Sequence, residues 1–148
     1  MSRLQFRTRI PPFPQQHLEA VAKILADTDG GLTGSAIGHA LTSCGIRDVD
    51  PTNTKWKRLY NAFAVFQNEH HVGNGVVVFI RHVMDPASHT GTPDVFGRWQ
   101  EDLNKVLSLS GTEIGRDGKI RRVRKAESLD EAVTRANRLR SALEQRKV

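Results

Sequence analysis

The chain has 148 residues, of which 38% are hydrophobic and 26% are charged, and its formal net charge is +6. This length suits one domain, or two small halves that share a core. The positive charge favours an anionic partner, nucleic acid first and an acidic protein surface second. No apolar run approaches the ~20 residues that cross a bilayer, so no membrane partner is expected. The single cysteine excludes an internal disulfide, which suits a reducing cytoplasm.

Residues 1–13 are expected to form an extended arm, because the prolines of "IPPFP" fix φ and restrict the residue before each of them. Pro14 suits the start of a helix through "QQHLEAVAKILAD", which "TDGG" ends. Its predicted buried residues are Leu18, Val21, Ala22 and Leu25. A second helix is predicted in "LTGSAIGHALTSCG", from an N-cap at Thr33 to a stop at Gly45.

A third helix is predicted from a cap at Asn53 or Thr54 towards Glu69, and it carries "TKWKRLYNAF". Its spacing separates a core face of Trp56, Leu59, Tyr60, Phe63 and Phe66 from a polar face. Lysine, arginine and asparagine side chains reach phosphates and base edges in nucleic acids. The candidate nucleic-acid contacts on this helix are therefore Lys55, Lys57, Arg58 and Asn61. The alternative is a solvated face on a core helix.

Two alternatives are open for residues 76–84. The β-branched run in "VGNGVVVFI" favours a strand or wing, and the alternative is a helix through "VVFIRHVMD". With a wing, residues 14–90 have the element order of a winged helix-turn-helix whose third helix reads DNA. The connection "CGIRDVDPTN" is longer than the three- or four-residue turn of the compact motif.

Residues 91–148 are expected to form a helix–hairpin–helix extension that shares the core of the first part. Thr92 and Pro93 suit a helix start, and the predicted core stripe is Val95, Phe96, Trp99, Leu103, Val106 and Leu107. Asp117-Gly118 predicts a hairpin at Glu113–Val123 with a type I′ turn. Ser128 and Glu131 match a capping box for a last helix. That helix is expected to bury Leu129, Ala132, Val133, Ala136, Leu139 and Leu143. The predicted fold is thus mainly α with a short β-hairpin.

The hairpin segment is the second basic feature. Its candidate nucleic-acid contacts are Arg116, Lys119, Arg121, Arg122 and Arg124. A β-ribbon with cations on both faces can lie along a phosphate backbone, where counterion release raises affinity. The alternative is a charged edge that prevents aggregation between strands.

Catalytic and metal sites find little support in the sequence. His70 and His71 are adjacent and point apart on a helix, and one cysteine cannot make a zinc framework. Cys44 has no nearby base in the sequence, so a buried structural thiol is favoured over a nucleophile. We therefore expect no enzymatic activity, no cofactor and no bound metal.

Long strings of the chain resemble a known family. "IPPFPQQHLEAVAKILADTDGGLTGSAIGHALTSCGIRDVDPTNTKWKRLYNAF", "FIRHVMDP" and "DGKIRRVRKAESLDEAVTRANRLRSALEQR" are similar to the N-terminal module of the bacterial Ymh-type family, whose members are linked by context to abortive infection and phage defence. The resemblance covers almost the whole chain. Longer members continue into a HEPN-like helical domain, which is expected to be absent here. Ala36 departs from the family pattern, where an acidic residue is usual.

The resemblance implies a sensor, adaptor or regulatory module and no established activity. Two functions of different class therefore remain open. The first is a cytoplasmic, non-enzymatic module that binds nucleic acid, DNA foremost, in a phage-defence context. The second is a protein-interaction or regulatory module that docks a defence effector or self-associates as a homo-oligomer. Salt dependence distinguishes them, because phosphate contacts weaken steeply with added salt and apolar docking does not.

Overall fold

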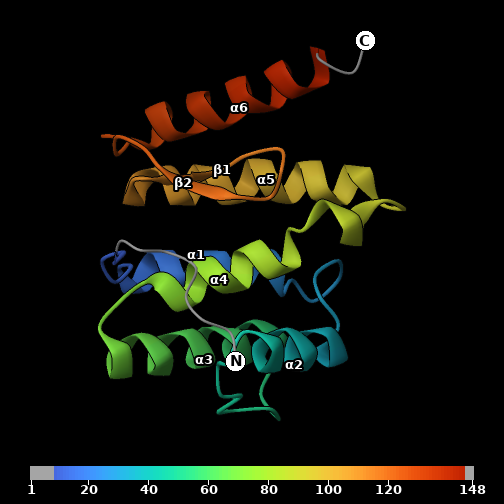
Figure 1. The fold of residues 1–148 in the computed structure, drawn as a ribbon, viewed down its shortest axis with the longest axis vertical. Coiled ribbons are helices and arrows are strands. Elements are labelled where there is room, and N and C mark those ends of the chain that lie inside the picture. The colour runs from blue at the N-terminus through green and yellow to red at the C-terminus, as the bar shows by residue number, and fades with distance from the viewer. Residues whose placement is uncertain (1–8, 146–148) are drawn as a thin grey trace. The chain divides into compact units, whose positions relative to one another are not determined.

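The computed structural model describes residues 9–145, with side chains described as far as Ser141. The chain divides into two compact units, residues 1–83 and residues 84–148. The described residues form six α-helices, two short 3-10 helices and one two-stranded antiparallel hairpin (Figure 1). This confirms the predicted fold class, mainly α with a short β-hairpin.

The first unit consists of four helices around one core. They are α1 (Gln15–Leu25), α2 (Gly34–Ser43), α3 (Lys55–His70) and α4 (Asn74–Val83). Helix α1 packs on α3, while α2 and α3 both pack on α4. The predicted helix ends are confirmed: the Oγ1 atom of Thr33 accepts a hydrogen bond from the backbone N–H of Ala36 at 3.1 Å, and Gly45 follows α2 at a φ of 72°.

Helix α4 resolves the alternatives for residues 76–84. The segment is helical through Val83, so the interpretation as a strand is wrong. Seven of the ten residues of α4 are buried, among them Val76 and Val77 of the β-branched run, because the helix is enclosed in the core of the first unit. The described residues of the first unit therefore hold no strand, and α3 is followed by a buried helix where a winged helix-turn-helix would have its wing.

The second unit is built on two long helices. Its elements are η1 (Pro86–His89), α5 (Pro93–Leu107), η2 (Ser108–Ser110), β1 (Thr112–Ile114), β2 (Ile120–Arg122) and α6 (Leu129–Gln145). Helix α6 packs along α5, and β1 lies on α5. The side-chain amide of Asn104 on α5 pairs with both backbone groups of Ile114, at 2.7 and 3.0 Å. This buried contact fixes the hairpin to the helix.

The hairpin turn differs from the predicted type. The N–H of Gly115 donates to the carbonyl of Lys119 at 2.9 Å, and the N–H of Gly118 donates to the carbonyl of Gly115 at 3.0 Å. Gly118 has a φ of 77°, but Asp117 is not at positive φ. A type I′ turn requires positive φ at both residues, so the loop is instead a three-residue connection closed by a left-handed glycine.

Several core predictions hold and others do not. Phe63, Trp99 and Leu103 are buried, and the rings of Phe63 and Phe79 meet edge to face with centroids 5.1 Å apart. Trp56 and Tyr60 are only half-buried. On α6, Ala132 and Ala136 are buried as predicted, Val133 and Leu139 are half-buried, and Leu129 at the first position of the helix is 65% exposed. Leu143 lies outside the described side chains.

Candidate nucleic-acid interface

The polar face of α3 is largely committed to contacts within the first unit. The Nε of Arg58 lies 3.0 Å from Oδ1 of Asp48, its Nη2 lies 2.5 Å from Oδ2, and its Nη1 donates to the carbonyl of Gly34 at 3.0 Å. The Arg58 side chain is only 12% exposed. The hydrogen bond to Asp48 raises the pKa of Arg58, so the side chain stays charged in this pair. The expectation that Arg58 projects freely is therefore wrong.

Asn61 is engaged in the same way. Its Nδ2 donates to Oδ2 of Asp50 at 2.9 Å, and the same carboxylate oxygen accepts from Asn53 at 2.8 Å. Asp48 and Asp50, in the loop before α3, thus bind the two α3 side chains that are best suited to hydrogen bonding with base edges. Asn61 therefore does not project freely together with Arg58, and its contact with nucleic acid stays a prediction.

The two lysines of α3 remain available. Lys57 is exposed, and its Nζ lies 5.9 Å from the ring centroid of Trp56. Lys55 is half-buried at the first turn. Neither forms an ion pair with the residues that the structure describes. Lysines at this position can add positive charge but bring no hydrogen-bonding pattern for a particular base.

The hairpin presents its cations with few internal partners. Arg116 and Lys119 are exposed in the loop, and Arg122 is exposed at the end of β2. Within residues 9–145, none of these three forms an ion pair. Arg121 reaches Asp117 only at 4.0 Å, the long limit for an ion pair. Four of the predicted hairpin residues are thus exposed with little charge neutralisation.

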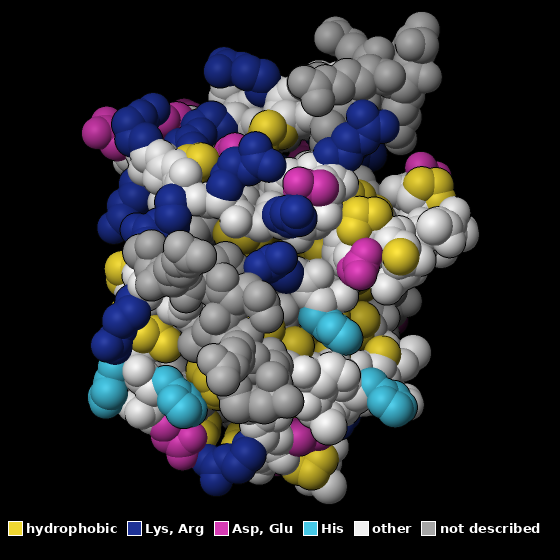
Figure 2. Space-filling model, viewed as in Figure 1, with side chains coloured by type: hydrophobic (Ala, Val, Ile, Leu, Met, Phe, Trp, Pro, Cys, Tyr) yellow, Lys and Arg dark blue, Asp and Glu magenta, His cyan; other side chains and the backbone are white. Residues whose placement is uncertain are grey.

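Strand register decides how these cations are arranged. Arg121 is opposite Glu113, and Arg122 is opposite Thr112, which is fully buried. Because side chains alternate along a strand, Arg121 lies on the solvent face and Arg122 on the face that packs against the unit. Arg122 is nevertheless exposed, at the last position of β2. In the face shown in Figure 2, Lys and Arg side chains crowd the region of the hairpin and α6, with fewer Asp and Glu among them.

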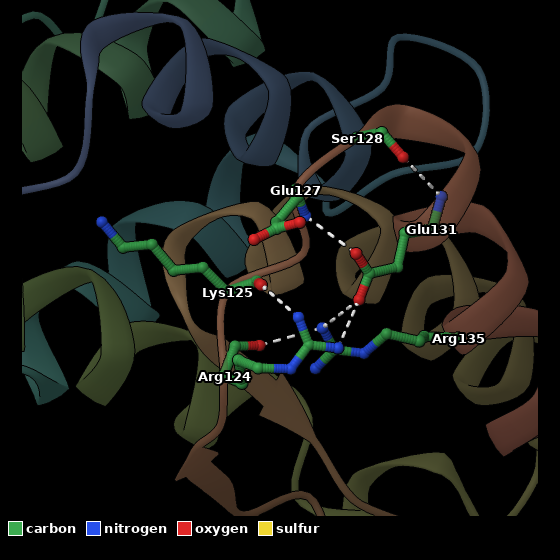
Figure 3. A network of polar contacts seen from close by, with 6 residues as sticks. All are labelled: Arg124, Lys125, Glu127, Ser128, Glu131 and Arg135. Atoms are coloured by element: carbon green, nitrogen blue, oxygen red, sulfur yellow. Dashed lines mark hydrogen bonds and ion pairs between the residues drawn. The ribbon is translucent and has the colours of Figure 1, made fainter.

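Arg124 has a different role from the other predicted hairpin residues. Its Nη2 donates to Oε2 of Glu131 at 2.7 Å, and its carbonyl accepts from Nη1 of Arg135 at 2.9 Å (Figure 3). The N–H of Glu131 donates to the hydroxyl of Ser128 at 3.1 Å, which confirms one of the two hydrogen bonds of the predicted capping box at the start of α6. Arg124 therefore joins the hairpin to the α6 cap, although its side chain is 70% exposed.

The carboxylate of Glu131 is the centre of this network. Its Oε1 accepts from the backbone N–H of Glu127 at 3.0 Å, one residue before the capping serine. That hydrogen bond, and then the one from Arg124, lower the pKa of Glu131. The carboxylate of Glu131 therefore stays ionised at a lower pH than an ordinary glutamate, and it continues to balance the charge of Arg124.

An open depression of about 480 Å³ lies beside this network. It is lined by Arg124, Asp130, Glu131, Thr134, Arg135 and Arg138. Arg138 is exposed and, among the described residues, has no ion-pair partner. Sequence reasoning did not single out Arg138, although its i, i+3 spacing from Arg135 places both on one face of α6.

The other reactive side chains do not converge. Among residues 9–145, no three His, Cys, Asp or Glu side chains are grouped as a metal site would require. Burial raises the pKa of Cys44 to about 11, and its sulfur faces the carbonyl of Val78 at 3.9 Å. A thiol in this state is a poor nucleophile. The absence of catalysis and of cofactors stays a prediction.

No described helix combines the length and apolar character needed to span a membrane. Comparison with known protein families, with curated proteins and with solved structures finds no match. The assignment of function therefore depends on the geometry above, and the resemblance to the Ymh-type family stays a prediction.

Proposed function

We propose that this chain is a non-enzymatic module that binds the sugar-phosphate backbone of nucleic acid through its β-hairpin. The observation that carries the proposal is the exposure of Arg116, Lys119 and Arg122 without an ion-pair partner among the described residues. A solvated cluster of cations releases counterions from a phosphate backbone when it binds, and this supplies affinity without sequence information. Asn104 supports the proposal because it anchors the hairpin on α5, so the cations are carried on a fixed element.

Double-stranded DNA is the proposed ligand class. Proteins that prefer single strands stack bases on exposed aromatic rings. In the described part of the second unit, Trp99 is buried and Phe96 is half-buried, and His89 lies against both rings. A duplex backbone fits a surface of cations without a stacking platform. Recognition through α3 is not proposed, because Arg58 and Asn61 are held by Asp48 and Asp50.

The biological setting is a further proposal. The resemblance to the Ymh-type family favours a bacterial phage-defence context and a cytoplasmic location, where the module would bring DNA to an effector. The alternative, an adaptor with an apolar docking surface, ranks second. Among the described residues, the large hydrophobic side chains that are exposed are Val49 and Leu129, which are too few for an interface of ordinary size.

Fluorescence anisotropy with labelled duplex DNA, single-stranded DNA and duplex RNA, over a series of salt concentrations, tests the proposal. We expect duplex DNA to bind at low salt, more tightly than the single strand, with little dependence on sequence. Four hairpin contacts predict a slope of log K against log salt of about −3 to −4. Absence of binding to every probe at low salt would reject the proposal in favour of the adaptor.

A further inference from the structure

The short segment Ile10–Phe13 lies on the first unit in a regular pattern of exposure. Ile10 and Phe13 are each only 5% exposed, while Pro11 and Pro12 between them are exposed. Prolines favour the polyproline II conformation, which has three residues per turn, so positions i and i+3 point to the same side. The segment therefore presents two apolar anchors to the protein and two prolines to solvent.

Each backbone polar group of the two anchor residues is paired. The N–H of Ile10 donates to Oδ1 of Asn74 at 2.8 Å, and its carbonyl accepts from the N–H of Gly73 at 2.7 Å. The N–H of Phe13 donates to Oε1 of Gln67 at 2.9 Å, and its carbonyl accepts from Nε2 of Gln67 at 2.8 Å. Because proline has no N–H, these two donors are the only ones in the segment, and both are used.

The groove that receives the segment is formed by the end of α3 and the start of α4. Gln67 and Asn74 are 8% and 2% exposed, so two buried amides are directed at the backbone of the segment. Gly73 lies between them, and a Cβ atom there would approach the carbonyl oxygen of Pro11 to 2.6 Å and the ring of Phe13 to 2.8 Å. The groove is therefore shaped to admit an extended backbone at close range.

These contacts select an extended backbone and the two apolar side chains of Ile10 and Phe13, and they are not part of the regular hydrogen bonding of a helix or sheet. Hydrogen bonds to a peptide backbone, together with contacts to spaced apolar side chains, are a recurring way for proteins to bind extended peptides. We infer that the groove of Gln67, Gly73 and Asn74 is a recognition site for polyproline II segments with the pattern apolar-Pro-Pro-aromatic, which residues 10–13 fill in cis. A partner protein that carries a segment of this chemistry binds there when the arm leaves.

The test uses full-length protein with a weakened arm. Phe13→Ala removes one anchor and leaves the groove unchanged. The probe is a synthetic peptide with the sequence of residues 9–14, "RIPPFP". Its binding is measured by calorimetry and by the thermal melting of the protein. We expect the peptide to bind Phe13→Ala with one-to-one stoichiometry and to raise its Tm in a saturable manner. Wild-type protein should bind it far more weakly, because the tethered arm competes at a local concentration on the order of millimolar.

Two matched controls define the site. The same peptide with alanine in place of phenylalanine should bind about a hundredfold more weakly or worse, because a buried aromatic anchor is lost. Adding Gly73→Ala to Phe13→Ala should abolish binding, whereas adding Gly91→Ala, a glycine with open space around it, should not. If Phe13→Ala does not fold, Phe13→Leu keeps an apolar side chain and takes its place.

Three results would overturn the inference. The first is that the folded Phe13→Ala protein does not bind the peptide. The second is binding that survives Gly73→Ala. The third is that the wild-type protein is a dimer that Gly73→Ala converts to a monomer, since the groove would then bind the arm of a second copy through domain swapping.

Discussion

Replacing Arg58 with alanine is expected to destabilise the first unit, even though the residue lies on the polar face of α3. Its guanidinium group bonds to Asp48 and to the carbonyl of Gly34. Removing it leaves a partly buried carboxylate without its counter-ion and a carbonyl without its donor. The matched control is Lys57→Ala, because Lys57 is exposed one residue earlier on the same helix.

The degree of burial sets the magnitude. Breaking a buried ion pair costs about 3–5 kcal/mol, whereas an exposed pair contributes about 0–1 kcal/mol. The side chains of Arg58 and Asp48 are 12% and 25% exposed, which places the pair between these limits. We therefore expect a loss of about 2–3 kcal/mol from a total stability of about 5–15 kcal/mol. For a chain of this length, the Tm should fall by about 6–12 °C.

Thermal and urea unfolding of wild type, Arg58→Ala, Asp48→Ala and the double variant measures this loss. The double-mutant cycle should give a coupling energy of about 1–2 kcal/mol between the two residues, because each single change removes the same contact. Lys57→Ala should stay within about 0.5 kcal/mol of wild type. If Arg58→Ala unfolds like Lys57→Ala, the ion pair does not hold α3 and its preceding loop together.

Three further outcomes are expected. Gly118→Ala should cost about 1–2 kcal/mol or more, because the residue has a φ of 77° and its Cβ would meet the carbonyl of Met84, whereas Gly91→Ala should be nearly neutral in the same melting assay. Glu131→Gln should lower the Tm near pH 7 but match wild type in strong acid. The pKa of Glu131 is lowered in the folded protein, so the carboxylate stabilises the fold fully above its unfolded-state pKa, and this stabilisation is lost as the pH falls through the folded-state pKa. At pH 8, the native thiol of Cys44 should react with a disulfide reagent on the order of a hundredfold more slowly than in guanidinium chloride, since burial raises its pKa to about 11.

Local signals predicted the helix boundaries well. Pro14 before α1, Thr33 before α2, Pro93 in α5 and the Ser128–Glu131 capping box each act within one turn of the chain, so the sequence displays them directly. The type of the hairpin turn was missed, because "RDGK" is compatible with either a two-residue or a three-residue loop and hydrogen bonding to Gly115 decides between them.

The errors at the candidate site have a tertiary origin. Arg58 looked solvent-exposed because its partner, Asp48, lies ten residues away in a loop whose path no periodicity reveals. Gln67 looked like one more polar residue of α3, yet its amide is buried against Phe13, 54 positions earlier. By contrast, the exposure of Arg116 and Lys119 followed from a local hairpin signal and was predictable.

The salt dependence of duplex DNA binding, compared between two sets of variants, tests the central proposal most directly. One protein carries glutamine at Arg116, Lys119, Arg121 and Arg122, and the control carries glutamine at Lys55 and Lys57. Each lost phosphate contact should reduce the slope of log K against log salt by about one, so the hairpin variant should lose about three to four units and the α3 control less than one. A hairpin variant that keeps the wild-type slope, while the α3 control loses it, would contradict the assignment of the interface to the hairpin.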